Sequence, residues 1–101
     1  MEIKRKLPLA ITHAAREKII EIRKQKNIAS DYYLRLGVKS AGCGVASYVI
    51  GFDHKTEKDV LYSLPDFDVI IEKTQVLHLA GKKVDFDEVD GEKGFVFRDS
   101  N

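Results

Sequence analysis

The fold is decided by residues 32–44, which read Tyr32-Tyr33-Leu34-Arg35-Leu36-Gly37-Val38-Lys39-Ser40-Ala41-Gly42-Cys43-Gly44. Every second residue from Leu34 to Val38 is apolar, and the cations Arg35 and Lys39 occupy the intervening register. Such alternation is typical of a β-strand that buries one face and exposes the other. Residues 32–39 therefore predict a half-buried strand, and the glycines beside Cys43 predict a loop after it.

The sequence on both sides of this stretch predicts an α+β chain of mostly antiparallel, locally paired strands. Thr12 has the character of an N-cap residue, because its hydroxyl can accept a hydrogen bond from a free amide of a helix at about 13–26. Residues 7–11 are restricted by Pro8 to an edge strand or an extended lead-in. The later patterns predict strands at 46–52, 60–64, 67–72, 83–89 and 95–98 and a short helix at about 74–80. The core candidates of the closing hairpin are Phe86, Phe95 and Phe97.

Composition narrows the class of protein. The chain has 101 residues, 44% of them hydrophobic and 33% charged, which predicts a single globular domain over residues 1–101. A net charge of +1 argues against nucleic acid as a partner and favours association between copies. No apolar run is long enough to span a membrane, and no secretory signal is evident. With one cysteine, an internal disulfide is excluded, and we expect a cytoplasmic protein.

Cys43 is the leading candidate for chemistry. The glycines on both sides leave its thiol uncovered by neighbouring side chains. Lys39 and Arg35 would lower the pKa of the thiol if they turned toward it. The alternative is that Cys43 is a small buried apolar residue, which is the commoner role of a lone cysteine.

Other polar residues give weaker signals. The remaining soft-metal candidates are His13, His54 and His78, and none has the close His/Cys pairing of a zinc site. Four carboxylates cluster near the end of the chain, at Asp85, Asp87, Glu88 and Asp90. A catalytic or cation-binding pair is conceivable there, but a solvated strand face next to a turn is the favoured interpretation. No catalytic triad or phosphate-binding loop is present, so we expect a protein that is not an enzyme.

Several blocks of the sequence occur in a familiar order. They are Leu34-Arg35-Leu36-Gly37-Val38-Lys39-Ser40-Ala41-Gly42-Cys43-Gly44, Ser47-Tyr48-Val49-Ile50-Gly51-Phe52, Asp68-Val69-Ile70-Ile71, Leu79-Ala80-Gly81-Lys82-Lys83-Val84-Asp85-Phe86 and Gly94-Phe95-Val96-Phe97-Arg98-Asp99-Ser100-Asn101. In this order they resemble the HesB/IscA-like family of A-type iron–sulfur cluster carriers. The resemblance extends from about Leu9 to Asn101 and implies a HesB-like barrel or sandwich with an N-terminal helix and one short helix.

The resemblance also implies a role for Cys43. Carriers of this family have three cysteines, and Cys43 matches the first of them. The other two belong to a Cys-Gly-Cys tail, which would begin where the sequence ends at Asn101. The chain therefore resembles a variant without that tail, either a tailless relative or a truncated piece. Only Cys43 can be carried over as a cofactor-binding or metal ligand.

The number of thiolates limits what one chain can hold. A [2Fe–2S] or [4Fe–4S] cluster usually takes four thiolates. Iron or a cluster would thus be shared between subunits of a dimer or tetramer, or completed by exogenous thiols such as glutathione. The leading hypothesis is a protein of iron–sulfur cluster assembly or iron binding, with assembly or acceptor proteins as partners. Two alternatives remain: a binding or scaffold module that holds no cofactor, and a redox-active thiol protein.

Overall fold

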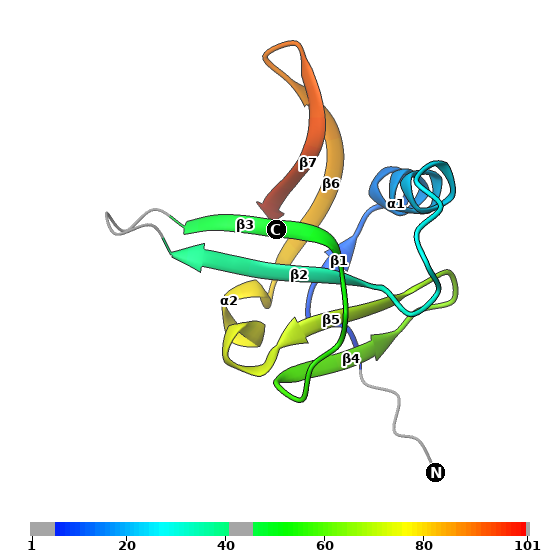
Figure 1. Cartoon of the computed structure of the whole chain (residues 1–101). Helices are drawn as coiled ribbons and strands as arrows, with labels where there is room; N and C mark the ends of the chain where they lie inside the picture. Colours follow the sequence, from blue (N-terminus) through cyan, green and yellow to red (C-terminus); the bar gives the residue numbers. More distant parts are fainter. Residues whose placement is uncertain (1–5, 41–45, 101) are drawn as a thin grey trace.

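A computed structural model of the chain describes residues 6–40 and 46–100 (Figure 1). Their elements are β1 (Ala10–Ile11), α1 (His13–Gln25), β2 (Tyr33–Ser40), β3 (Ala46–Asp53), β4 (Asp59–Ser63), β5 (Asp68–Glu72), the 3-10 turn η1 (Lys73–Gln75), α2 (Val76–Leu79), β6 (Lys82–Val89) and β7 (Glu92–Asp99). One sheet has the order β1-β6-β7 and the other the order β3-β2-β5-β4. The predicted α+β class is confirmed, as a sandwich-like pair of open sheets rather than a closed barrel.

Helix α1 begins where its cap was predicted. The Thr12 hydroxyl accepts a hydrogen bond from the Ala15 amide at 3.2 Å. The helix ends at Gln25, one residue before the predicted end, and Asn27 follows with a φ of 48°. Asparagine tolerates this left-handed conformation better than most residues, which explains the stop at that point.

The strand pairing is mostly local and antiparallel, as predicted, with two exceptions. The pairs β2–β3, β4–β5 and β6–β7 are antiparallel and local, as predicted. However, β1 pairs with β6 in parallel, and so does β2 with β5. Each of these short parallel pairs joins segments that are distant in the sequence, and the alternation of a strand does not say which other strand lies beside it.

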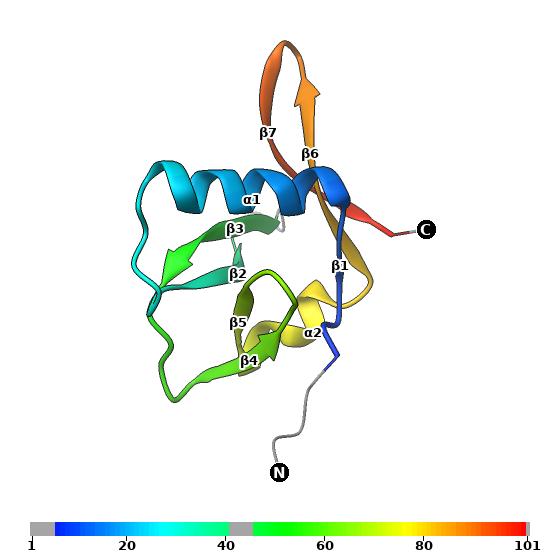
Figure 2. The ribbon, with the colours of Figure 1, turned by 90° about the vertical axis from the view of Figure 1, so that its right-hand side faces the viewer.

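The closing hairpin is longer and its turn tighter than predicted. Strand β7 begins at Glu92, so the turn is only Asp90–Gly91, with φ values of 53° and 80°. Two consecutive left-handed residues are typical of the two-residue turn that best matches strand twist. The hairpin rises past α1 and away from the rest of the molecule (Figures 1 and 2).

The core lies between α1 and the sheets. Its fully buried side chains are Ala15, Ile19, Leu34, Leu36, Val69, Ile70, Ile71, Leu79 and Val84. The prediction that Phe86, Phe95 and Phe97 belong to the core holds only in part. They pack against it but stay half-buried, because they lie on the projecting hairpin. Among the described residues, no helix is long and apolar enough to cross a membrane.

Candidate functional site

The candidate site lies at one end of the β2–β3 ribbon. Cys43 falls outside the described residues, but the strands before and after it are placed. They pair along their full length, from Tyr33 opposite Asp53 to Ser40 opposite Ala46. Leu34 and Leu36 on β2 are buried, and Val38 packs against the core. The ribbon that carries Cys43 is therefore anchored through one apolar face, as the alternation predicts.

An aromatic stack joins this ribbon to the last strand. The ring of Tyr48 on β3 lies parallel to that of Phe97 on β7, with centroids 4.6 Å apart and planes 7° apart. Beside it, Lys82 forms an ion pair with Asp99, and this contact raises the pKa of Lys82. The half of β3 nearer to Cys43 is thus fixed against the C-terminal strand.

A glycine on β2 makes room for a side chain from the 3-10 turn. The Val38 amide donates a hydrogen bond of 3.1 Å to the Gln75 side-chain oxygen. A Cβ atom at Gly37 would lie 2.7 Å from that same oxygen, which is closer than real Cβ contacts allow. Gly37 thus permits the Gln75 carboxamide to satisfy an amide of β2, and this ties η1 to the ribbon.

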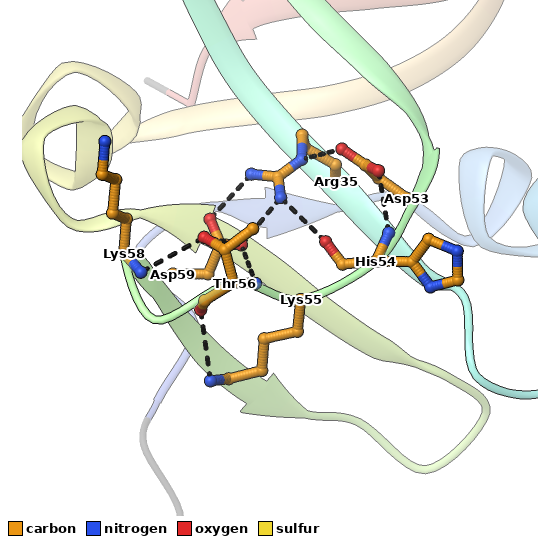
Figure 3. A network of polar contacts seen from close by, with 7 residues as sticks. All are labelled: Arg35, Asp53, His54, Lys55, Thr56, Lys58 and Asp59. Atoms are coloured by element: carbon orange, nitrogen blue, oxygen red, sulfur yellow. Dashed lines mark hydrogen bonds and ion pairs between the residues drawn. The ribbon is translucent and has the colours of Figure 1, made fainter.

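At the other end of β2, Arg35 organises a polar network (Figure 3). Its two terminal nitrogens each donate a 2.7 Å hydrogen bond to an oxygen of Asp59, and its Nε donates to Asp53 at 2.7 Å. The Asp59 side chain is 1% exposed, and its carboxylate also accepts from the Thr56 amide at 2.8 Å. Because the paired guanidinium favours the ionised carboxylate, the pKa of Asp59 falls to about 2.

This network bears on the condition under which Arg35 would lower the pKa of the Cys43 thiol. The guanidinium of Arg35 is paired with the carboxylates of Asp53 and Asp59, so that condition is not met for Arg35. Lys39 is exposed near the end of β2. The sequence did not predict this network, because the separation of Arg35 and Asp59 in the sequence does not indicate an ion pair. Only the register of the mixed sheet brings them together.

The histidines lie apart from one another. His13 contacts Glu17 on the surface of α1 at 3.0 Å. The His54 ring packs on Tyr32 with centroids 4.2 Å apart, and His78 is exposed on α2. Within residues 6–40 and 46–100, no group of three or more His, Cys, Asp or Glu side chains is placed to hold a metal ion.

The carboxylates of β6 form a structural cluster. Arg98 donates to Asp85 at 2.7 Å and to Asp87 at 2.8 Å, and these contacts help to lower the pKa of both acids. Asp85 also accepts a 2.7 Å hydrogen bond from the Thr12 hydroxyl, which is the first cause of its own lowered pKa. A solvated face was predicted here. Asp87, Glu88 and Asp90 are indeed exposed, but Asp85 is only 24% exposed and links the start of α1 to the hairpin.

Solved structures with a similar arrangement include two proteins whose names refer to iron–sulfur clusters. The fold matches Escherichia coli SufA, involved in biosynthesis of iron–sulfur clusters, with a TM-score of 0.70, 25% identity and coverage of 90% of this chain and 79% of that one. It also matches a structure of IscA with the [2Fe–2S] cluster, with a TM-score of 0.71, 21% identity and coverage of 92% and 86%. The second match speaks for the fold alone.

The sequence comparisons define the family. Residues 7–101 match the family described as iron-sulphur cluster biosynthesis. Relatives include an iron–sulfur cluster assembly 1 homolog of Dictyostelium discoideum, 28% identical over 96% of this chain and 71% of that protein. Another is the iron-binding protein IscA of Xenorhabdus nematophila, 29% identical over 94% and 88%. The chain belongs to the iron–sulfur cluster biosynthesis family, of the HesB/IscA type, and its role lies in iron–sulfur cluster assembly.

Proposed function

We propose that this chain is a carrier or scaffold that holds iron or an iron–sulfur cluster through the thiolate of Cys43 and passes it on without acting as an enzyme. The observation that carries the proposal is the position of Cys43 between β2 and β3, in a chain whose residues 7–101 match the family. The relative named an iron-binding protein supports the same cargo.

The number of thiolate ligands that a cluster needs suggests that copies of this chain associate. Residues 1–101 supply one thiolate, whereas a cluster usually takes four. We therefore propose a homodimer or tetramer in which two or more copies of Cys43 meet, with small thiols completing the coordination. The near-zero net charge offers little repulsion between copies. Assembly and acceptor proteins would be the further partners.

The described residues would serve as a frame for this site. The ion pair of Arg35 with Asp59 and the stack of Tyr48 on Phe97 hold the two ends of the β2–β3 ribbon in place. A frame fixed at both ends loses less entropy when its loop binds a ligand. We propose that residues 1–101 work as one such unit, in the cytoplasm, where a lone thiol stays reduced.

Cluster transfer tests the function. Protein reconstituted anaerobically with iron and sulfide is mixed with an apo-ferredoxin, and the acceptor's absorbance is followed after separation. We expect wild type and His54→Ala to convert the acceptor equally, and Cys43→Ser to convert almost none. Equal transfer by Cys43→Ser would show that Cys43 is not the ligand, whereas no transfer by wild type would support the scaffold that holds no cofactor. A redox-active thiol is disfavoured because Arg35 is paired with acids, and it requires a thiol pKa well below about 8.5.

A further inference from the structure

The outer edge of β7 is the strongest feature that the proposed function does not use. In the described part of the chain, β7 has a neighbour on one side only, because the sheet order is β1-β6-β7. The direction of its backbone groups follows from one hydrogen bond. The carbonyl of Val84 accepts from the Thr12 amide, so the backbone groups of Val84 point away from β7.

Because backbone N–H and C=O groups point to alternate sides along a strand, the direction at Val84 fixes the direction at each residue of β7. Val84 lies opposite Phe97, so these two form a pair without mutual hydrogen bonds. Phe97 therefore directs its N–H and C=O groups outward, and so do the residues two and four positions away on the same strand. The outward-directed residues are Lys93, Phe95, Phe97 and Asp99.

Such an edge is a template for another strand. Exposed edges are normally kept short or blocked, since unpaired N–H and C=O groups invite pairing. Strand β7 is instead eight residues long and contains the apolar run Phe95-Val96-Phe97. Its outer half lies on the hairpin that projects from the molecule (Figures 1 and 2). A two-stranded ribbon of this kind gains from a further strand.

We infer that β7 pairs antiparallel with β7 of a second copy, around a two-fold axis at Val96. In this register Lys93 lies opposite Asp99 of the other copy, and Phe95 lies opposite Phe97. The side chains of Lys93 and Asp99 are exposed. This register therefore places opposite charges across from each other, and it places one aromatic ring across from another. The two-fold symmetry repeats each pair, so the interface is self-complementary.

Neighbouring registers are poorer. A two-fold axis at Phe95 places the charge of Lys93 opposite Phe97 and leaves Asp99 beyond the bonded pairs. A two-fold axis at Phe97 places Phe95 opposite the carboxylate of Asp99. Only the axis at Val96 matches charge to charge and ring to ring while using all the outward-directed residues.

Disulfide trapping tests the register. The inference rests on the self-association proposed above, but it does not depend on iron binding. Directly opposite residues without mutual hydrogen bonds have Cα atoms about 4.5 Å apart, within the range that a disulfide spans. Val96→Cys, made in a Cys43→Ser background, should therefore link to its copy under mild oxidation and run as a dimer without reductant.

Gly94→Cys in the same background is the matched control. No heavy atom lies within 4 Å of a Cβ built at Gly94, so the change fits the fold. In the inferred register the two copies of residue 94 are offset by four positions, about 13 Å, and should not link. Equal linking of both variants, or none by Val96→Cys while ultracentrifugation shows a dimer, would overturn the inference and leave self-association standing. A protein that sediments as a monomer at every concentration would overturn both.

A charge variant gives a second measurement. Lys93→Glu should raise the dissociation constant of the dimer about threefold to tenfold, because it faces Asp99 with a like charge in both symmetric pairs. Lys83→Glu is the control, since Lys83 lies on β6, away from the outer edge. An equal effect of both changes would point to net charge and overturn the register.

Discussion

Arg35 on β2 and Asp59 on β4 are joined by two hydrogen bonds of 2.7 Å, although β5 lies between their strands in the sheet. The carboxylate is buried at 1% exposure, whereas the guanidinium is 21% exposed. The pair thus holds in place the end of the β2–β3 ribbon that lies away from Cys43. Removing one partner of such a pair is strongly destabilising, because the other partner is left as an uncompensated charge.

Asp59→Ala should destabilise the protein strongly. The change leaves Arg35 with the exposed carboxylate of Asp53 and the backbone carbonyl of His54 as its remaining partners. Removing one member of a buried pair costs about 3 kcal/mol of unfolding free energy. Urea unfolding of the metal-free protein measures it. As a control, Asp53→Ala removes a carboxylate that is 53% exposed and should cost less than about 1 kcal/mol. Equal losses for the two variants would contradict the account.

The same carboxylate predicts an acid transition. The pKa of Asp59 is lowered from 3.8 to about 2 in the folded protein, so the folded state binds its proton later than the unfolded state does. The stabilisation of about 2 kcal/mol is therefore complete above pH ~4 and is lost as the pH falls toward ~2. Urea titrations at a series of pH values should show this loss in wild type and a flatter profile in Asp59→Asn. Parallel profiles would contradict it.

Gly37→Ala tests the fit of Gln75 against β2. The new methyl group would displace the side-chain oxygen of Gln75 and break its hydrogen bond to the Val38 amide, at a cost of about 1 kcal/mol. In a Gln75→Ala background the same substitution should cost much less, because the obstructing oxygen is gone. A double-mutant cycle by thermal unfolding measures the coupling, and additive effects would show that the two residues are independent.

The hydroxyl of Thr12 makes two hydrogen bonds, and two substitutions distinguish their contribution to stability from that of the side chain's shape. Its hydroxyl accepts from Ala15 to cap α1 and donates to Asp85 on β6. Thr12→Val keeps the shape and loses both contacts, and it should cost about 1–2 kcal/mol in chemical unfolding. Thr12→Ser keeps the hydroxyl and should stay within about 0.5 kcal/mol of wild type. A Ser variant as unstable as the Val variant would refute this.

The parts of the fold that depend on one strand or one helix could be predicted from the sequence. The alternation from Leu34 to Val38 marks the buried face of β2, and Thr12 marks the start of α1, because both signals are local. The parallel neighbours of β1 and β2 could not be predicted, since alternation reports burial and not the partner. The same reason hides the contact of Arg35 with Asp59. Cys43 was singled out by the sequence, and it lies outside the described residues.

The most direct test of the central proposal is the iron and sulfide retained per chain after anaerobic reconstitution and desalting. Wild type and His54→Ala should retain both elements and show the visible absorbance of thiolate-bound iron. Cys43→Ser should lose nearly all of both, while its unfolding curve matches that of wild type. If Cys43→Ser retains as much iron and sulfide as wild type, Cys43 is not the ligand and the proposed function fails.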